Sequence, residues 1–111
     1  MTEEPAIIVE RLRQAVLSRR YRLTLHAELE RDADQITIEE IEQALLSEQC
    51  GVIEDYPTDP RGASCLVLGF TSQGSPIHIL CGVAVPDMLV IITVYRPDPS
   101  QWINWRIRRE V

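Results

Sequence analysis

The sequence predicts a single α+β domain, in which N-terminal helices pack on a four-stranded antiparallel meander sheet and a C-terminal helix follows. Apolar residues recur at helical spacing up to about residue 50, and after that point short apolar runs alternate with turns. A length of 111 residues corresponds to one domain, 1–111. The apolar share of 45% is ordinary for a globular protein and sufficient for a core.

The first part of the chain predicts a helix, a short strand and a second helix. Pro5 suits the first turn of a helix over residues 6–18. Apolar side chains recur there at helical spacing: Ile8, Leu12, Ala15 and Val16. Residues 21–27, YRLTLHA, alternate in polarity and indicate a short strand or an extended entry. Helix formers at 27–32 predict at most two turns, and we expect residues 1–4 to be disordered.

The clearest helical signal lies in residues 34–48, DQITIEEIEQALLSE. Thr37, followed three positions later by Glu40, predicts a capping box. The apolar stripe of this helix comprises Ile38, Ile41, Ala44 and Leu45. Gly51 is a natural helix breaker, so the helix is expected to end before it.

Four strands are predicted after Gly51 because the apolar period changes there. They are expected at residues 51–56, 63–70, 77–83 and 88–95. Short turns between them predict antiparallel neighbours. Two of these strands are apolar at nearly every position, so both faces of the sheet should be covered. Residues 98–111 predict a C-terminal helix capped near Asp98 or Ser100.

The charge pattern restricts the partners. The net charge is −6 and all eleven cations are arginine, which argues against broad nucleic-acid binding but permits a small arginine-lined site. The arginines cluster at positions 19, 20 and 22 and again at 106, 108 and 109. No apolar run is long enough for a membrane span, and the acidic start does not resemble a signal peptide. We therefore expect a cytoplasmic protein that does not bind membranes.

The three cysteines are expected to be small buried hydrophobic residues. Cys50, Cys65 and Cys81 show no CxxC spacing, so a disulfide framework is not predicted. His78 and Cys81 are three apart in a predicted strand and therefore point to opposite faces, which argues against a zinc site. No cofactor or metal is expected.

The candidate catalytic residues are the histidines and the end of the last strand. His26 lies near a helix start, with Glu30 on the same helix face. One interpretation is that His26 is a general acid or base, and the other is that it only forms a hydrogen bond at the helix entry. His78 lies inside a strand, where a satisfied, half-buried histidine is the alternative interpretation. Tyr95 and Arg96 end the last strand, where side chains commonly enter a cleft.

If the protein is an enzyme, these candidate side chains permit only a reaction without a cofactor. The chain has no G-x-S-x-G, no phosphate-binding glycine loop and no H-E-x-x-H. Cleavage of RNA through its 2′-hydroxyl needs a base, an acid and cations for the phosphate. Histidine, tyrosine, glutamate and arginine side chains can supply these groups.

Several segments together resemble a small prokaryotic family, domain of unknown function 4258. They are LHAELERDADQITIEEIEQALLS, VIEDYPTDPRG, CLVLGF, PIHILCGV and LVIITVYRPDP, within about residues 22–99. The resemblance implies a fold like that of RelE-type ribonuclease toxins, which commonly accompany a small antitoxin, sometimes of a zinc-finger type. The site residues that it nominates are His26, Arg31, His78, Tyr95 and Arg96.

The leading hypothesis is therefore the toxin of a type II toxin–antitoxin pair, cleaving RNA without a metal. In it His26 is the acid or base, Arg31 and Arg96 hold the phosphate, and His78 and Tyr95 assist. The rival is an inactive binding or regulatory domain of the same fold that acts through protein–protein contacts. The acidic charge and the absence of lysine favour this rival. An antitoxin, RNA and a second copy of the chain are the expected partners, the last through the sheet or through the C-terminal helix with Trp102.

Overall fold

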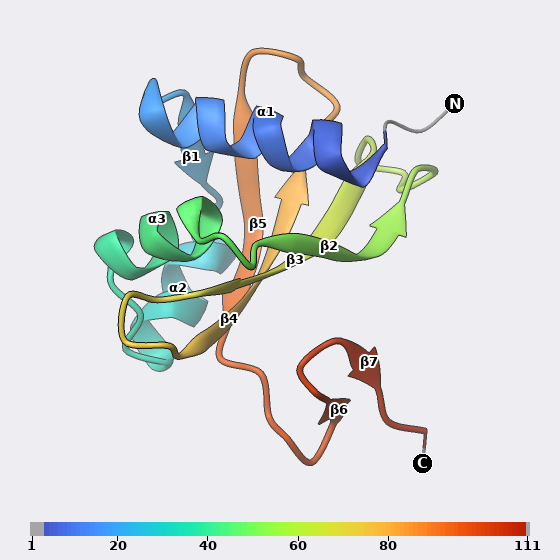
Figure 1. The fold of residues 1–111 in the computed structure, drawn as a ribbon. Helices are drawn as coiled ribbons and strands as arrows, with labels where there is room; N and C mark the ends of the chain where they lie inside the picture. Colours follow the sequence, from blue (N-terminus) through green and yellow to red (C-terminus); the bar gives the residue numbers. More distant parts are fainter. Residues whose placement is uncertain (1–3, 111) are drawn as a thin grey trace.

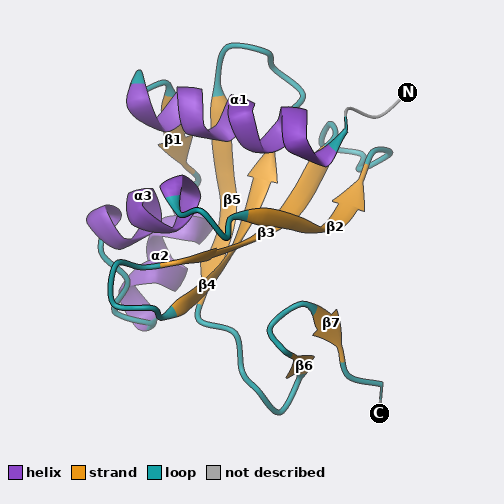
Figure 2. Ribbon diagram, in the orientation of Figure 1, coloured by secondary structure: helices purple, strands orange, loops and turns teal. Residues whose placement is uncertain are grey.

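The computed structural model describes residues 4–110, so three of the four residues expected to be disordered lie outside the described range. The helices are α1 (Pro5–Leu17), α2 (Leu25–Ala33) and α3 (Ile38–Leu46) (Figures 1 and 2). The main strands are β1 (Tyr21–Leu23), β2 (Gly51–Tyr56), β3 (Ser64–Phe70), β4 (Pro76–Gly82) and β5 (Leu89–Tyr95). Two short strands follow, β6 (Trp102–Ile103) and β7 (Ile107–Arg108).

The α+β class is confirmed, but the predicted four-stranded antiparallel meander is wrong. The main sheet has five strands in the order β1-β5-β4-β3-β2. The strands β2 to β5 pair antiparallel in sequence order, whereas β1 pairs parallel to β5, with Tyr21 opposite Leu89. A strand of three residues is too short for its periodicity to show whether it joins a sheet. Its parallel partner comes from the far end of the chain, so no local signal marks the pair.

The predicted C-terminal helix is also wrong, because the segment folds into the hairpin β6–β7. Asn104 and Trp105 have φ of 51° and 65°, and Arg106 N–H donates to the Ile103 carbonyl at 3.0 Å. Two successive residues at positive φ are typical of the turns that close hairpins, and asparagine tolerates that conformation. The hairpin also buries the Trp102 side chain, which keeps only 4% of its surface exposed.

The helix ends follow the sequence signals. Thr37 accepts from Glu40 N–H while the Glu40 carboxylate accepts from Thr37 N–H, so the predicted capping box is present. Thr24 caps α2 by accepting from Ala27 N–H at 3.1 Å. Pro5 occupies the first turn of α1, as expected.

The core lies between the helices and one face of the main sheet. Its sheet side is formed by Cys65, Val67, Ile77, Ile79, Cys81, Leu89, Ile91 and Val94. Its helix side includes Ile8, Leu12, Val16, Ala27, Ile41, Ala44 and Leu45. All three thiols are free, with Cys65 and Cys81 buried and Cys50 half-buried. Because burial disfavours the thiolate, it raises the pKa of Cys50 to about 11 and that of Cys65 to about 12.

The opposite face of the sheet is covered in part by the chain itself. Leu66, Leu68 and His78 point to this face and are buried. The C-terminal hairpin lies there, on the side away from the three helices (Figure 1). A partner is therefore not required to cover this end of the sheet, and the role predicted for a C-terminal helix with Trp102 does not apply.

Candidate functional site

Helix α2 lies along the part of the β5 edge that β1 leaves open. Thr24 ends the parallel pairing, because its N–H donates to the Ile91 carbonyl at 3.0 Å and its hydroxyl donates to the Ile92 carbonyl at 2.9 Å. The same hydroxyl accepts at the start of α2. One threonine thus terminates β1, begins α2 and fixes the helix against β5.

Two carboxylates of α2 take the place of a neighbouring strand. The Glu30 carboxylate accepts from Val94 N–H at 3.2 Å, and the Asp34 carboxylate accepts from Arg96 N–H at 2.9 Å. Four residues of helix advance by about 6 Å, and two residues of strand by about 6.7 Å, so the two spacings match. The edge amides of β5 are satisfied without a sixth strand, as part-buried amides require.

His26 extends outward from this edge. Its Nε2 lies 3.3 Å from a Glu30 oxygen, and 66% of its side chain is exposed. Glu30 also holds Val94, so its carboxylate links the imidazole to the end of β5. The expected contact between His26 and Glu30 is present, and its surroundings are a solvent-exposed helix face.

Arg96 serves the junction between α2 and α3. Its Nε donates to the Asp34 carbonyl and its Nη2 to the Gln35 carbonyl, both at 3.0 Å. The same guanidinium lies 3.3 Å from the Glu40 carboxylate. The hydrogen bond from Thr37 N–H has the largest effect on Glu40 and lowers its pKa. Burial opposes this shift, and the hydrogen bonds and charge of Arg96 add to the lowering. Gln35 has a φ of +54°, a strained turn conformation that Arg96 stabilises.

Arg31 is engaged at the same junction. Its Nε lies 2.9 Å from the Glu28 carboxylate, and its Nη1 donates to the Ile36 carbonyl at 3.2 Å. Both arginines nominated as phosphate ligands are therefore hydrogen bonded to backbone carbonyls of the turn between α2 and α3.

Replacing Arg96 with alanine should lower the free energy of unfolding by about 2 kcal/mol, because the turn carbonyls lose their donor in a part-buried position. Thermal unfolding followed by circular dichroism measures this effect. Arg22, an exposed arginine of β1, provides the control, and Arg22→Ala should change the midpoint little. Equal midpoints for the two variants would contradict a structural role for Arg96.

His78 and Tyr95 form a direct pair on the face opposite the helices. They are register partners on β4 and β5, and His78 Nδ1 lies 3.0 Å from the Tyr95 hydroxyl. His78 Nε2 lies 2.6 Å from the Trp105 carbonyl oxygen. Because a carbonyl can only accept, Nε2 carries the proton, and Nδ1 accepts from the tyrosine hydroxyl. The His78 side chain has 0% exposed surface.

Aromatic and charged groups surround this pair. The Trp102 ring meets the His78 ring edge to face at 4.4 Å, and the Arg108 guanidinium stacks over Trp102 at 4.7 Å. Arg108 also makes two hydrogen bonds to the Glu54 carboxylate, at 2.7 and 3.0 Å. The Tyr56 hydroxyl donates to the same carboxylate. We call His78, Tyr95, Glu54 and Arg108 the His78 cluster.

The surroundings set the protonation states in the cluster. Burial lowers the pKa of His78, outweighing the hydrogen bond to Trp105 and the charge of Glu54 that raise it, so the imidazole is neutral near pH 7. Burial raises the pKa of Tyr95 to about 12. Burial also acts to raise the pKa of Glu54, but hydrogen bonds from Arg108 and Tyr56 outweigh it, and the net shift is downward. A neutral base, a protonated phenol and a fixed ion pair are thus adjacent.

Folding should become less favourable on acidification because of His78. Its pKa in the folded protein lies below the ordinary value of 6.5 expected for the unfolded chain. The unfolded chain therefore binds the proton more readily, and stability falls as the pH drops through 6.5 towards the lowered value. Thermal midpoints between pH 8 and pH 5 test this, with His78→Gln as the reference. If the thermal midpoints of the wild-type protein and His78→Gln changed in parallel with pH, the predicted contribution of His78 would be contradicted.

The structure therefore separates the residues nominated from the sequence. His78 and Tyr95 are in contact, whereas His26, Arg31 and Arg96 belong to α2 and its junction with α3. Within residues 4–110, no hydrogen bond or ion pair joins the two histidines. The sequence analysis did not predict the role of Glu54 or the contacts of the C-terminal segment with His78. The arginine cluster at 106–109 hinted at a site, but it did not show where in the fold that site lies.

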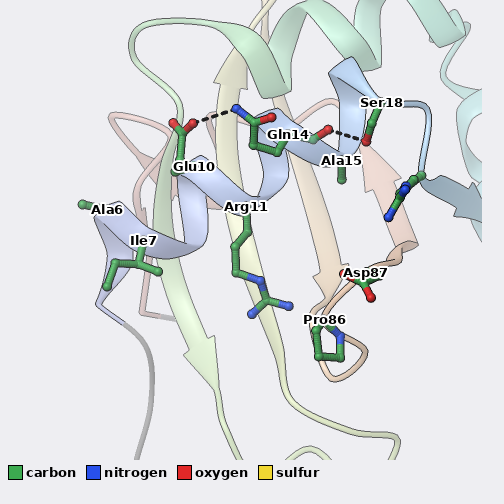
Figure 3. Close-up of a pocket in the computed structure, with 10 residues that line it drawn as sticks. Ala6, Ile7, Glu10, Arg11, Gln14, Ala15, Ser18, Pro86 and Asp87 are labelled. Atoms are coloured by element: carbon green, nitrogen blue, oxygen red, sulfur yellow. Dashed lines mark hydrogen bonds between the residues drawn. The ribbon is translucent and has the colours of Figure 1, made fainter.

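A separate pocket of about 470 Å³ lies between α1 and the loop that precedes β5 (Figure 3). Arg11 extends across it towards Pro86 and donates to the Val83 carbonyl at 3.1 Å. None of the nominated site residues lines this pocket. In the described part of the chain, no group of three or more histidine, cysteine, aspartate or glutamate side chains is arranged to hold a metal.

Comparison with known proteins identifies one family. The family described as Domain of unknown function (DUF4258) matches residues 23–96. No curated protein and no solved structure matches the chain. None of the described helices is long and apolar enough to cross a membrane. The matched segment runs from the end of β1 to the residue after β5, and it includes all five nominated residues but not the C-terminal hairpin. It covers about two thirds of the sequence, and the chain therefore belongs to the DUF4258 family.

Proposed function

We propose that this protein is a metal-independent endoribonuclease, the toxin of a toxin–antitoxin pair, whose acid–base chemistry resides in the His78 cluster. The observation that carries the proposal is the hydrogen bond between a neutral histidine and a protonated tyrosine, adjacent to an arginine. These are the base, the acid and the cation that cleavage through a 2′-hydroxyl requires. The resemblance to RelE-type toxins, drawn from the sequence, supports the same reaction class.

In this reaction His78 removes the proton of the 2′-hydroxyl, and the 2′-oxygen forms a bond to phosphorus. The bond between phosphorus and the 5′-oxygen breaks as Tyr95 protonates that oxygen. The products are a 2′,3′-cyclic phosphate and a 5′-hydroxyl. The imidazolium and phenolate that remain are hydrogen-bond partners, so one proton passes from His78 to Tyr95 and restores both groups.

The cationic role falls to Arg108 in this proposal. Arg31 and Arg96 are committed to backbone carbonyls of the turn between α2 and α3, whereas the Arg108 side chain is 61% exposed and contacts the side chains of Glu54, Tyr56 and Trp102. Arginine presents several donors in one plane, which suits the two non-bridging oxygens of a phosphate.

The test is cleavage of an end-labelled single-stranded RNA by the full chain in the presence of a chelator. We expect fragments that end in a 2′,3′-cyclic phosphate, and no cleavage at a position where a 2′-deoxynucleotide is placed. Fragments that end in a 3′-hydroxyl, or cleavage that stops on chelation, would contradict the proposed reaction.

A non-catalytic binding domain is the second candidate, and the burial of His78 favours it. In that case the cluster only fastens the C-terminal hairpin, and the protein acts through contacts with an antitoxin or a second copy. Folded, monodisperse protein that leaves RNA intact, even after the cluster is made accessible, would favour this candidate over the nuclease.

A further inference from the structure

We propose that the C-terminal hairpin, residues 98–110, is a displaceable autoinhibitory cover over the His78–Tyr95 pair. Its closed position is the one described above, and its displacement would open the pair to a ligand. Displacement would also release Arg108 from Glu54, so in the open state Arg108 would bind the phosphate from the displaced hairpin. The regulatory meaning of the cover rests on the proposed nuclease function, whereas the opening itself does not depend on it.

The cover is held by a small number of contacts. Trp102 lies against the His78 ring, the Trp105 carbonyl accepts from His78, and Arg108 pairs with Glu54. Together with Tyr95, these contacts occupy both ring nitrogens of His78 and place the Trp102 ring against the imidazole. No substrate atom can reach the imidazole while they persist, because its side chain has no exposed surface.

The hairpin is built as a separate unit. Its two strands have two residues each and form their own sheet. Among residues 4–110, no backbone-to-backbone hydrogen bond joins the hairpin to the five-stranded sheet. Small units with few buried contacts open at lower free energy than the core does. The family match ends at residue 96, so the hairpin lies outside the matched segment.

The hairpin has a turn of unusual backbone conformation and exposed apolar surface. Trp105, a bulky residue, has a φ of 65°, an arrangement that persists only where surrounding contacts impose it. Ile103 and Ile107 face each other across the hairpin and remain exposed, Ile107 at 63%. Lifting the hairpin leaves the core undisturbed, because the core lies between the helices and the other face of the sheet.

The two histidines make opening measurable. Diethyl pyrocarbonate acylates accessible neutral imidazole, so exposed His26 serves as an internal standard for buried His78. Peptide mass spectrometry separates the two rates. The buried thiols of Cys65 and Cys81, on the helix side of the sheet, report global unfolding through their reaction with a maleimide.

The variants are Trp102→Ala, which removes the ring that covers His78, and the matched control Ile103→Ala, which shortens a neighbouring side chain that is 39% exposed. Truncating a buried tryptophan should raise the rate of His78 acylation by more than roughly tenfold. The His26 rate, the thiol rates and the control variant should stay unchanged, and RNA cleavage by Trp102→Ala should rise with His78 accessibility.

Two results would contradict the proposal that the hairpin is a displaceable cover. One is an unchanged rate at His78 in Trp102→Ala, and the other is a parallel rise at Cys65 and Cys81, which would mean that the whole domain opens. A selective rise at His78 without any RNA cleavage would support the cover and count against the nuclease. The two proposals can therefore fail separately.

Discussion

Replacing His78 with glutamine should reduce RNA cleavage by roughly 10²–10⁴-fold, the usual contribution of general acid–base catalysis. Glutamine can hydrogen bond to Tyr95 and to the Trp105 carbonyl, but it cannot take up a proton near neutral pH. The rate of cleavage of a labelled RNA under single-turnover conditions measures the effect. Tyr95→Phe should lower the same rate, because it removes the hydroxyl and keeps the ring.

The matched control for this experiment is His26→Gln. His26 is an exposed histidine on α2 whose described partner is Glu30, so its replacement should leave cleavage unchanged. The opposite result, loss of activity in His26→Gln and full activity in His78→Gln, would assign the reaction to the edge of α2 instead. Thermal midpoints of all three variants separate loss of chemistry from loss of folding.

Gly69→Ala should have the largest effect on stability, lowering the free energy of unfolding by about 3 kcal/mol. A Cβ atom at this position would lie 2.2 Å from the Ala44 carbonyl oxygen and 2.6 Å from its carbon. Both are backbone atoms at the end of α3. They cannot move away easily, because the Ser47 side chain donates to that carbonyl at 2.7 Å and accepts from Phe70 N–H at 3.2 Å.

Gly51 offers a matched control at the start of β2. Its nearest neighbour would be 3.9 Å from an added Cβ, so Gly51→Ala should change stability by well under 1 kcal/mol. Urea unfolding of both variants, with unchanged slopes, gives the comparison. If Gly69→Ala were as stable as Gly51→Ala, the close packing of α3 on β3 would be wrong.

The local signals of the chain predicted its local structure. The Thr37–Glu40 capping box and the proline at the start of α1 depend on groups within four residues of each other, so they form as the sequence indicates. The alternation after Gly51 likewise predicted strands that form as β2 to β5. Such features require no knowledge of distant contacts.

The candidate site followed from the sequence only in part. His78 and Tyr95 were nominated, but their contact arises from the register between β4 and β5. Arg96 was nominated as a phosphate ligand through the family resemblance, with support from its position at the end of the last strand. Its partners are carbonyls of the turn between α2 and α3, about sixty residues away in sequence, so its role in that turn could not be read locally.

The sequence by itself determined the α+β class, the caps of the helices and the four strands that follow them, because these depend on short-range spacing and on apolar periodicity. Only the tertiary structure decided the parallel position of β1, since three residues carry no period and their partner lies at the other end of the domain. It also decided the conformation of the C-terminal segment. Trp102 and Trp105 are three residues apart, which suits a helix face, but a hairpin lets Trp102 bury against His78 and lets the Trp105 carbonyl accept from its ring. Contacts with a strand more than twenty residues earlier, rather than local propensity, set that outcome.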